Sequence, residues 1–179
     1  MSLRDGSETR DGRYKNGRGT GRDAGMLSGS CRFGLWFVHV WWSGDTIHRV
    51  RFAATGIPGD VPVPIRQYCA GKPVDLTAIP SIAPDDDSVY GRIYKRVRQV
   101  PYGKTATYGE IAAAVGTAPR VVGQAMARNP TALVIPCHRI VAAKGIGGFT
   151  PPVEIKEELL AMEKRTLRKN RPSAQEPPA

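Results

Sequence analysis

Long apolar runs are missing from this sequence. The longest candidate, residues 33–42, is interrupted by His39 and falls well short of the roughly 18 apolar residues that cross a bilayer. The first residues are polar and charged and lack the apolar core of a secretory signal. These absences argue against a membrane-spanning helix, so we expect a soluble, intracellular protein without a membrane partner.

Cysteine is also scarce. Cys31, Cys69 and Cys137 are an odd number of thiols at wide spacings. No Cys-x-x-Cys pair or Cys/His cluster has the spacing of metal ligands, so we expect neither a metal site nor a disulfide framework. A reducing compartment is consistent with this pattern, and at least one thiol is free.

Acidic residues are outnumbered, with 16 Asp and Glu against 26 Lys and Arg, which leaves a net charge of +10. This excess favours a polyanionic partner such as nucleic acid, although general solubility would explain it as well. With 179 residues, of which 41% are hydrophobic, the chain is long enough for one ordinary domain or two small ones.

The N-terminal part of the chain divides into a tail and a small α+β domain. Residues 1–27 are rich in Gly, Arg and Asp and predict a disordered tail, and Met26 could be the natural start. Residues 28–84 predict an α+β domain. Alternating apolar residues on both sides of a turn at 43–45 indicate a β-hairpin, and residues 64–70 a short helix. No chemistry is visible in this domain.

Residues 85–169 predict a mainly helical second domain, followed by a C-terminal tail at 170–179. Asp87 or Ser88 can cap a first helix whose apolar residues Val89, Ile93 and Val97 recur every four positions. The capping box of Thr107 and Glu110 opens a second helix that ends at Gly116, and a third follows over 120–128. Two short helices joined by a tight turn indicate a helix-turn-helix, and the whole chain has an α+β fold.

The third of these helices carries little bulk. Gly123 and Ala127 share a face, and Ala125 is small as well. Such a surface allows DNA to approach the backbone, but close packing against another helix is an equally good explanation. Arg120 at the helix start favours nucleic acid, because a cation and free N–H groups there can meet phosphate or a base.

Cys137 is the candidate nucleophile. It follows Pro136 and an apolar run, 133–135, of the buried-strand type, and His138 and Arg139 follow it directly. Cations near a thiol favour the reactive thiolate, whereas a lone buried cysteine is ordinarily a small hydrophobe. From these residues alone both explanations stay open.

The last helix, expected over 153–169, adds a buried carboxylate. Its apolar arc contains Glu163 near the middle and Lys156 near the start. Lys156 could extend its amine out to solvent. Glu163 needs a partner, which His138 or Arg139 could supply, either for catalysis or as a structural ion pair.

Over about residues 88–165 the sequence resembles the O6-alkylguanine-DNA alkyltransferases, also called methylated-DNA–protein-cysteine methyltransferases. The matching segments occur in order at 101–103, 107–110, 120–125, 128–130, 135–139, 147–149, 156–157 and 159–163. Each segment is weakly specific alone, but the ordered set is highly specific.

The resemblance implies single-turnover transfer of the alkyl group from O6-alkylguanine to Cys137, with O4-alkylthymine as an additional candidate substrate. Double-stranded DNA would be bound in its minor groove by a monomer, with the base flipped out and without metal or cofactor. The implied catalytic residues are Cys137, His138, Glu163 and Tyr108. The implied substrate-binding residues are Asn129, Val141, Phe149 and Thr150. The implied DNA-binding residues are Arg120, Gly123, Ala125, Ala127 and Arg128.

Three departures from the family pattern concern the pocket. Phe149 stands where Tyr is common, Pro151-Pro152 replaces a flexible glycine pair, and Ala132 replaces a proline found in some members. We therefore predict that methyl transfer is retained and that bulky adducts react less readily. Three other functions remain possible: a lesion-binding protein without a nucleophile, a cysteine hydrolase, and a plain DNA-binding module.

Overall fold

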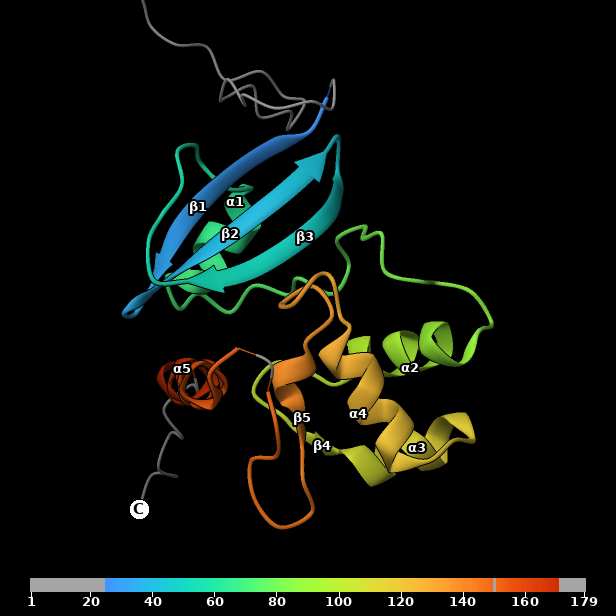
Figure 1. Ribbon diagram of the computed structural model, residues 1–179. Helices are drawn as coiled ribbons and strands as arrows, with labels where there is room; N and C mark the ends of the chain where they lie inside the picture. Colours follow the sequence, from blue (N-terminus) through green and yellow to red (C-terminus); the bar gives the residue numbers. More distant parts are fainter. Residues whose placement is uncertain (1–24, 150, 171–179) are drawn as a thin grey trace, which may run out of the picture.

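The computed structural model describes residues 25–149 and 151–170, which form a sheet unit and a helical unit (Figure 1). The sheet unit comprises β1 (Leu27–Phe33), β2 (Trp36–Ser43), β3 (Thr46–Ala53) and α1 (Val63–Cys69). The helical unit comprises α2 (Val89–Arg98), β4 (Ala106–Thr107), α3 (Tyr108–Val115), α4 (Pro119–Ala127), η1 (Cys137–Arg139), β5 (Ile140–Val141) and α5 (Val153–Lys169). The α+β fold class is confirmed, whereas the domain limits near 84 and 169 stay a prediction.

The sheet is antiparallel, in the order β1-β2-β3. The hairpin predicted around residues 43–45 is confirmed as β2 and β3. The sequence does not indicate the first strand as a separate element, because Leu35 continues the alternation of apolar residues. Instead the chain turns at Gly34, whose φ of 56° suits glycine, and Leu35 is 77% exposed. β1 also begins at Leu27, inside the expected tail; residues 1–24 lie outside the described residues.

Helix α1 packs on the inner face of the sheet. It starts one residue before the predicted helix and ends one residue earlier. Its buried side chains, Ile65 and Tyr68, join Val38 and Val40 of β2 in one apolar core. That core continues into the helical unit through Leu159 of α5, so the two units share a buried interface.

The caps predicted for the next helices are present. The Ser88 side chain accepts a hydrogen bond from Gly91 N–H, and Thr107 and Glu110 form the capping box of α3. Gly116 ends α3 with a φ of 70°, which confirms the short turn into α4. One apolar position was predicted wrongly: Val89, in the first turn of α2, is 39% exposed.

The segment before Cys137 is a compact turn and not the strand that its composition suggested. Leu133 is buried but has a φ of 74°, a left-handed conformation that cannot continue a strand. Pro136, with φ −77° and ψ 64°, is the centre of an inverse γ-turn in which Cys137 N–H donates to the Ile135 carbonyl at 2.7 Å. Because proline has a restricted φ near this value, it holds the backbone immediately before the thiol.

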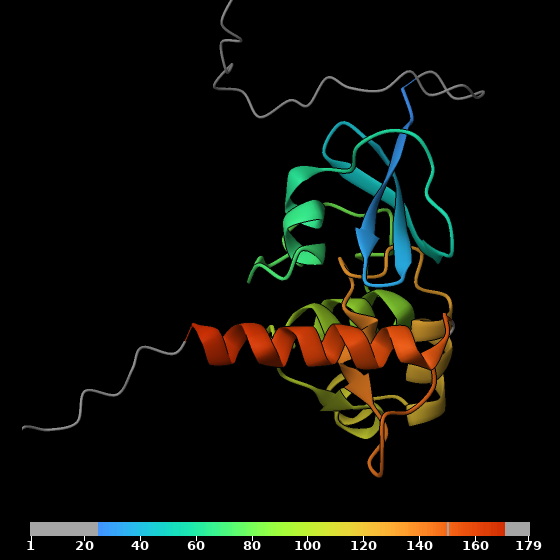
Figure 2. The same ribbon diagram turned by 90° about the vertical axis from the view of Figure 1, so that its left-hand side faces the viewer.

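Helix α5 has the predicted bounds and lies across one side of the other helices, below the sheet unit in the view of Figure 2. It buries both of its unusual polar residues, since Lys156 and Glu163 are 0% exposed. The expectation that Lys156 reaches solvent is therefore wrong. Among the helices of the described ranges, none is long and apolar enough to span a membrane.

Candidate active site

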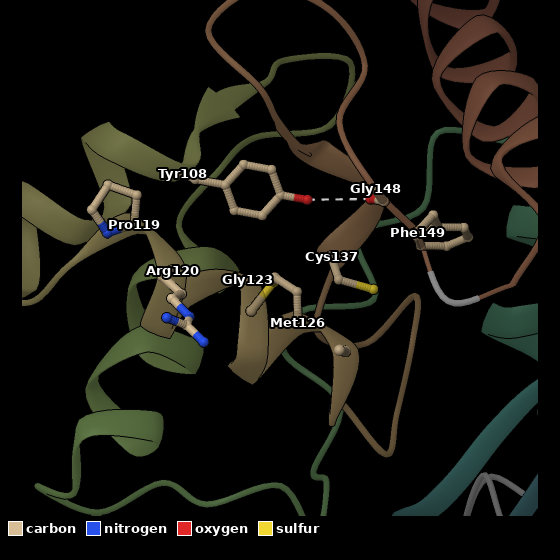
Figure 3. Close-up of a pocket in the computed structure, with 9 residues that line it drawn as sticks. Tyr108, Pro119, Arg120, Gly123, Met126, Cys137, Gly148 and Phe149 are labelled. Atoms are coloured by element: carbon tan, nitrogen blue, oxygen red, sulfur yellow. Dashed lines mark hydrogen bonds between the residues drawn. The ribbon is translucent and has the colours of Figure 1, made fainter.

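A cavity of about 500 Å³ opens between α4, the start of α3 and the segment before α5 (Figure 3). Cys137 lines this cavity and is 6% exposed. The other lining residues are Tyr108, Pro119, Arg120, Gly123, Met126, Ala127, Gly148 and Phe149. The candidate nucleophile thus lies in a pocket that is large enough for a base and has one thiol at its wall.

One wall of the cavity is built from Tyr108 and the loop at 147–149. The Tyr108 hydroxyl donates to the Gly148 carbonyl at 3.2 Å. Gly147 has a φ of 75°, and a Cβ there would lie 2.9 Å from the Tyr108 ring. Glycine is therefore required at 147 both for its conformation and for this close approach.

The opposite wall is α4. Arg120 is exposed at its first turn, and Ala127 is exposed at its last. A Cβ placed at Gly123 would meet no other part of the described chain within 4 Å, so helix packing does not explain that glycine. Ala125, in contrast, is 0% exposed, and its carbonyl accepts from the Tyr94 hydroxyl at 2.8 Å. The prediction that Ala125 contacts DNA is wrong, because its side chain faces the core.

Behind Cys137 lies a buried polar network centred on Glu163. Its Oε1 accepts from His138 Nε2 at 2.9 Å and from Arg139 Nη2 at 2.9 Å. Its Oε2 accepts from the Gly103 N–H at 2.7 Å. His138 and Arg139 are both almost fully buried. Both partners proposed for Glu163 are therefore present. The hydrogen bond from the Gly103 N–H to the same carboxylate holds the turn at 101–103 against α5.

Protonation states follow from this burial. Burial disfavours the charged form of Glu163, but the hydrogen bonds and charges of His138 and Arg139 outweigh it and lower the carboxyl pKa to about 2. Burial lowers the pKa of His138 and raises the pKa of the Cys137 thiol. At neutral pH the site therefore holds an ionised carboxylate, a neutral imidazole and a neutral thiol.

The imidazole has one ring nitrogen free. Nδ1 of His138 is buried and has no hydrogen-bond partner within residues 25–149 and 151–170, whereas Nε2 faces Glu163. Because a carboxylate only accepts, it selects the tautomer with hydrogen on Nε2. Nδ1 is then a free base on the residue next to the thiol.

Asn129 links the end of α4 to the segment before Cys137. Its Nδ2 donates to the Ile135 carbonyl at 2.9 Å, and its Oδ1 accepts from the Thr131 N–H at 3.0 Å. The side chain therefore fixes the compact turn described above. Asn129 does not line the large cavity, so the substrate-binding role that the resemblance implied for it stays a prediction.

A smaller cavity of about 120 Å³ adjoins the thiol on the side of β3. Its lining includes Cys137, Asn129, Ala132, Phe149, Pro151 and Arg51. Phe149 also contacts Phe52 of β3, with ring centroids 6.4 Å apart. Each of the three departures from the family pattern therefore places a residue beside this small space: Phe149, Ala132 and Pro151, the first proline of the pair.

Some predicted site residues lie outside the cavities. Val141 is half-buried in β5, where it pairs with Thr107. Arg128 is exposed, with its guanidinium over the Tyr90 ring at 5.9 Å and a hydrogen bond to that hydroxyl at 3.3 Å. Thr150 lies outside the described residues. For these three the predicted contacts with base or DNA stay predictions.

Two buried residues of the site were missed in the sequence. Lys156 Nζ donates to the carbonyls of Ile140 at 2.5 Å and Gly148 at 3.1 Å, and burial lowers its pKa to about 8. The Tyr68 hydroxyl donates to Glu163 Oε1 at 2.6 Å. Lys156 could have been recognised, since it lies on an apolar arc; Tyr68, 95 residues from Glu163, carries no such signal.

Within the part of the chain that the structure describes, no group of three or more His, Cys, Asp or Glu side chains is placed to hold a metal ion. The polar groups around Cys137 bind one another and the backbone. Their arrangement places a thiol next to a neutral imidazole whose Nε2 is held by a carboxylate, a geometry suited to nucleophilic chemistry.

Comparison with known proteins finds similar proteins for the second half of the chain. Residues 88–165 match the family described as 6-O-methylguanine DNA methyltransferase, DNA binding domain. The methylated-DNA–protein-cysteine methyltransferase of Metallosphaera sedula is 49% identical over 96 residues, 54% of this chain and 61% of that protein. The protein of that name from Sulfolobus acidocaldarius is 42% identical over 96 residues, with the same coverage. The match thus spans about three fifths of these relatives.

Solved structures extend the likeness to the sheet unit. The O6-methylguanine-DNA methyltransferase of Pyrococcus kodakaraensis is 26% identical, with a TM-score of 0.61, and the match covers 77% of this chain and 98% of that one. The O6-methylguanine methyltransferase of Mycobacterium tuberculosis is 24% identical, with a TM-score of 0.65 over 83% and 96% of the two chains, and it shows the common fold.

Proposed function

We propose that this protein, whose residues 88–165 match the family described as 6-O-methylguanine DNA methyltransferase, DNA binding domain, repairs DNA by taking the alkyl group of O6-alkylguanine onto Cys137. One observation carries the proposal. Cys137 lines a base-sized cavity, and the adjacent His138 keeps a free Nδ1 while Glu163 holds its other nitrogen.

DNA would dock on the helix-turn-helix of α3 and α4. The open side of Gly123 and the small Ala127 allow α4 to lie close to the sugar-phosphate backbone in the minor groove. Cys137 lies at the wall of this cavity and is only 6% exposed, so we expect the damaged guanine to rotate out of the duplex to reach it. Arg120, exposed at the rim, would fill the space that the base leaves.

The transfer is a substitution at the alkyl carbon. The Cys137 proton passes to His138 Nδ1 through a water molecule, and Glu163 stabilises the imidazolium that forms. The sulfur lone pair then forms the S–C bond as the C–O6 bond breaks, and that electron pair moves into the guanine ring. Tyr108, on the cavity wall, would donate a proton to the ring nitrogen.

The product determines how the protein is used. A thioether on Cys137 is stable, so each molecule would act once. All groups in the step belong to the protein, the DNA or water. We infer a monomer that acts inside the cell on double-stranded DNA, with methyl on O6 of guanine as the preferred adduct and O4-alkylthymine as a weaker substrate.

A lesion-binding protein without transfer is the second candidate. Such a protein would use the same helix-turn-helix and cavity but would need no thiol. Cys137 at the cavity wall, with a base and a carboxylate behind it, favours transfer over simple binding. A cysteine hydrolase would account for this group of residues but not for the exposed, small face of α4.

The test is the mass of the intact protein after incubation with a duplex that carries O6-methylguanine. We expect a gain of one methyl group, mapped to the peptide that contains Cys137. Cys137→Ser should show no gain, and Cys69→Ser, which removes a thiol outside both cavities, should react like the wild type. Binding of the lesion without a gain in mass would favour the second candidate, and repeated turnover would contradict a single-use thiol.

A further inference from the structure

The sheet unit places one polar group inside the buried network of the helical unit. Tyr68 lies on α1 and is 1% exposed, and its hydroxyl donates to Glu163 Oε1 at 2.6 Å. The Tyr68 hydroxyl oxygen also lies 3.1 Å from His138 Nε2. The ring of Tyr68 also packs edge-on against the His138 ring, with centroids 6.4 Å apart. The transfer step itself takes no proton from this hydroxyl.

The hydroxyl has a single proton, and it donates this proton in the hydrogen bond to the Glu163 carboxylate. Burial and the neighbouring Glu163 raise the pKa of Tyr68 well above its usual value, so the phenol remains protonated. Its oxygen can therefore approach His138 Nε2 only as an acceptor. Both Tyr68 and Glu163 then require hydrogen on Nε2, so Nδ1 of the neutral ring is unprotonated.

We propose that Tyr68 is a positioning residue for alkyl transfer: it fixes the tautomer and orientation of His138, so that Nδ1 can accept the thiol proton. The inference rests on the proposed function of Cys137. It also gives the sheet unit a part in the chemistry, because α1 supplies a second acceptor for the His138 Nε2–H beside Glu163 of the helical unit.

The positive charges around His138 oppose its protonation, and the Tyr68 contact counteracts them. Arg139 and Lys156 both lower the pKa of His138, and only Glu163 opposes them. Tyr102, the other tyrosine beside Tyr68, has its ring against Arg139. The Tyr68 oxygen, with its partial negative charge at Nε2–H, helps the imidazole to carry the proton that it takes from the thiol. Loss of the hydroxyl would leave a weaker and less well-oriented base.

The experiment compares Tyr68→Phe with the wild type in single-turnover methyl transfer from an O6-methylguanine duplex. We expect the maximal rate to fall about tenfold, the loss typical of one hydrogen bond to a charged group, while the protein concentration at half-maximal rate is unchanged. The acidic limb of the pH–rate profile should move to lower pH, because a weaker base loses its proton more readily. Tyr94→Phe is the matched control: Tyr94 is 2% exposed and donates to a backbone carbonyl, so its loss should not alter the limb.

A double-mutant cycle shows whether Tyr68 acts through His138. In the His138→Gln background, Tyr68→Phe should change the rate less than twofold, since the base is already gone. An equal tenfold loss in both backgrounds, or a Tyr68→Phe rate and limb like those of the wild type, would overturn the inference while the proposed function stood. A wild type that gains no methyl group would instead refute the proposed function.

A measurement on the unmodified protein covers the case in which Tyr68→Phe does not fold. The ¹⁵N chemical shifts of the His138 ring distinguish the two neutral tautomers without any DNA. We expect hydrogen on Nε2 and a bare Nδ1 at neutral pH. Hydrogen on Nδ1 would rule out the role proposed for Tyr68.

Discussion

Replacing Glu163 by Gln tests the buried network most directly. The change keeps the shape of the side chain but removes its charge, and it replaces one acceptor oxygen by an N–H donor. In either orientation that donor would meet another donor, because Oε2 faces the Gly103 N–H and Oε1 faces Tyr68, His138 and Arg139. Arg139, which is 2% exposed, would also lose its counter-ion.

Two estimates of the cost agree. Removing one partner of a buried ion pair typically costs about 3–5 kcal/mol. The carboxyl pKa, lowered from 4.5 to about 2, corresponds to about 3 kcal/mol of stability for the charged form. For a chain of this size each 1 kcal/mol shifts Tm by about 2–4 °C, so Glu163→Gln should lower Tm by about 6–20 °C.

Thermal unfolding at pH 7 is the assay, with Glu157→Gln as the control. Glu157 lies on the same helix but is exposed, and its replacement should leave Tm nearly unchanged. Adding Arg139→Met to Glu163→Gln should recover part of the loss, because the uncompensated charge is then removed. If Glu163→Gln melts within about 2 °C of the wild type, the carboxylate is not the buried, charge-paired group described here.

The difference in stability between the wild type and Glu163→Gln also depends on pH, in a direction that follows from the lowered carboxyl pKa. Because the folded-state pKa is depressed, the contribution of Glu163 is complete above its ordinary value of 4.5 and is lost as pH falls toward about 2. The gap in stability between the wild type and Glu163→Gln should therefore narrow in acid. A gap that widens below pH 4 would show that the carboxyl is not held ionised.

Three further predictions concern other parts of the site. Because the Lys156 pKa is lowered to about 8, the stability of the wild type relative to Lys156→Met should rise by up to about 3 kcal/mol as the pH rises from 8 to 10.5. Denaturant unfolding measures this difference, and a difference that stays constant with pH would contradict the lowered pKa. Gly123→Leu should weaken duplex binding at least tenfold without lowering Tm, because its side chain points into open space on α4 and leucine favours the helix; unaltered binding would place DNA elsewhere. Transfer from O6-benzylguanine should be slower than from O6-methylguanine, and Pro151→Gly should narrow the gap; equal wild-type rates would remove any role for the stiff segment near Phe149.

Local signals in the sequence predicted the helical unit well. The capping box of Thr107 and Glu110, the glycine at 116 and the apolar spacing of α5 depend only on residues a few positions apart. Short-range hydrogen bonds and helical periodicity set these features, so they can be derived without a tertiary structure. The helix-turn-helix and the location of Glu163 on a buried face followed from them.

Predictions failed where local composition was ambiguous. Leu133 to Ile135 had the composition of a strand, but the left-handed Leu133 forms a turn that is held from outside by Asn129. Ala125 is as small as its neighbours on α4 but faces the core, which its size could not reveal. Burial and turn geometry at such positions depend on segments that are distant in the chain.

The sequence by itself determined the helices, their caps, the candidate nucleophile and the resemblance of residues 88–165 to a known family. Only the tertiary structure decided which ring nitrogen of His138 is free, that Lys156 is buried, and that Tyr68 reaches Glu163 across 95 positions. The physical reason is distance along the chain. Caps and periodicity are interactions between near neighbours, whereas the protonation of a buried group depends on every charge and donor that folding brings around it.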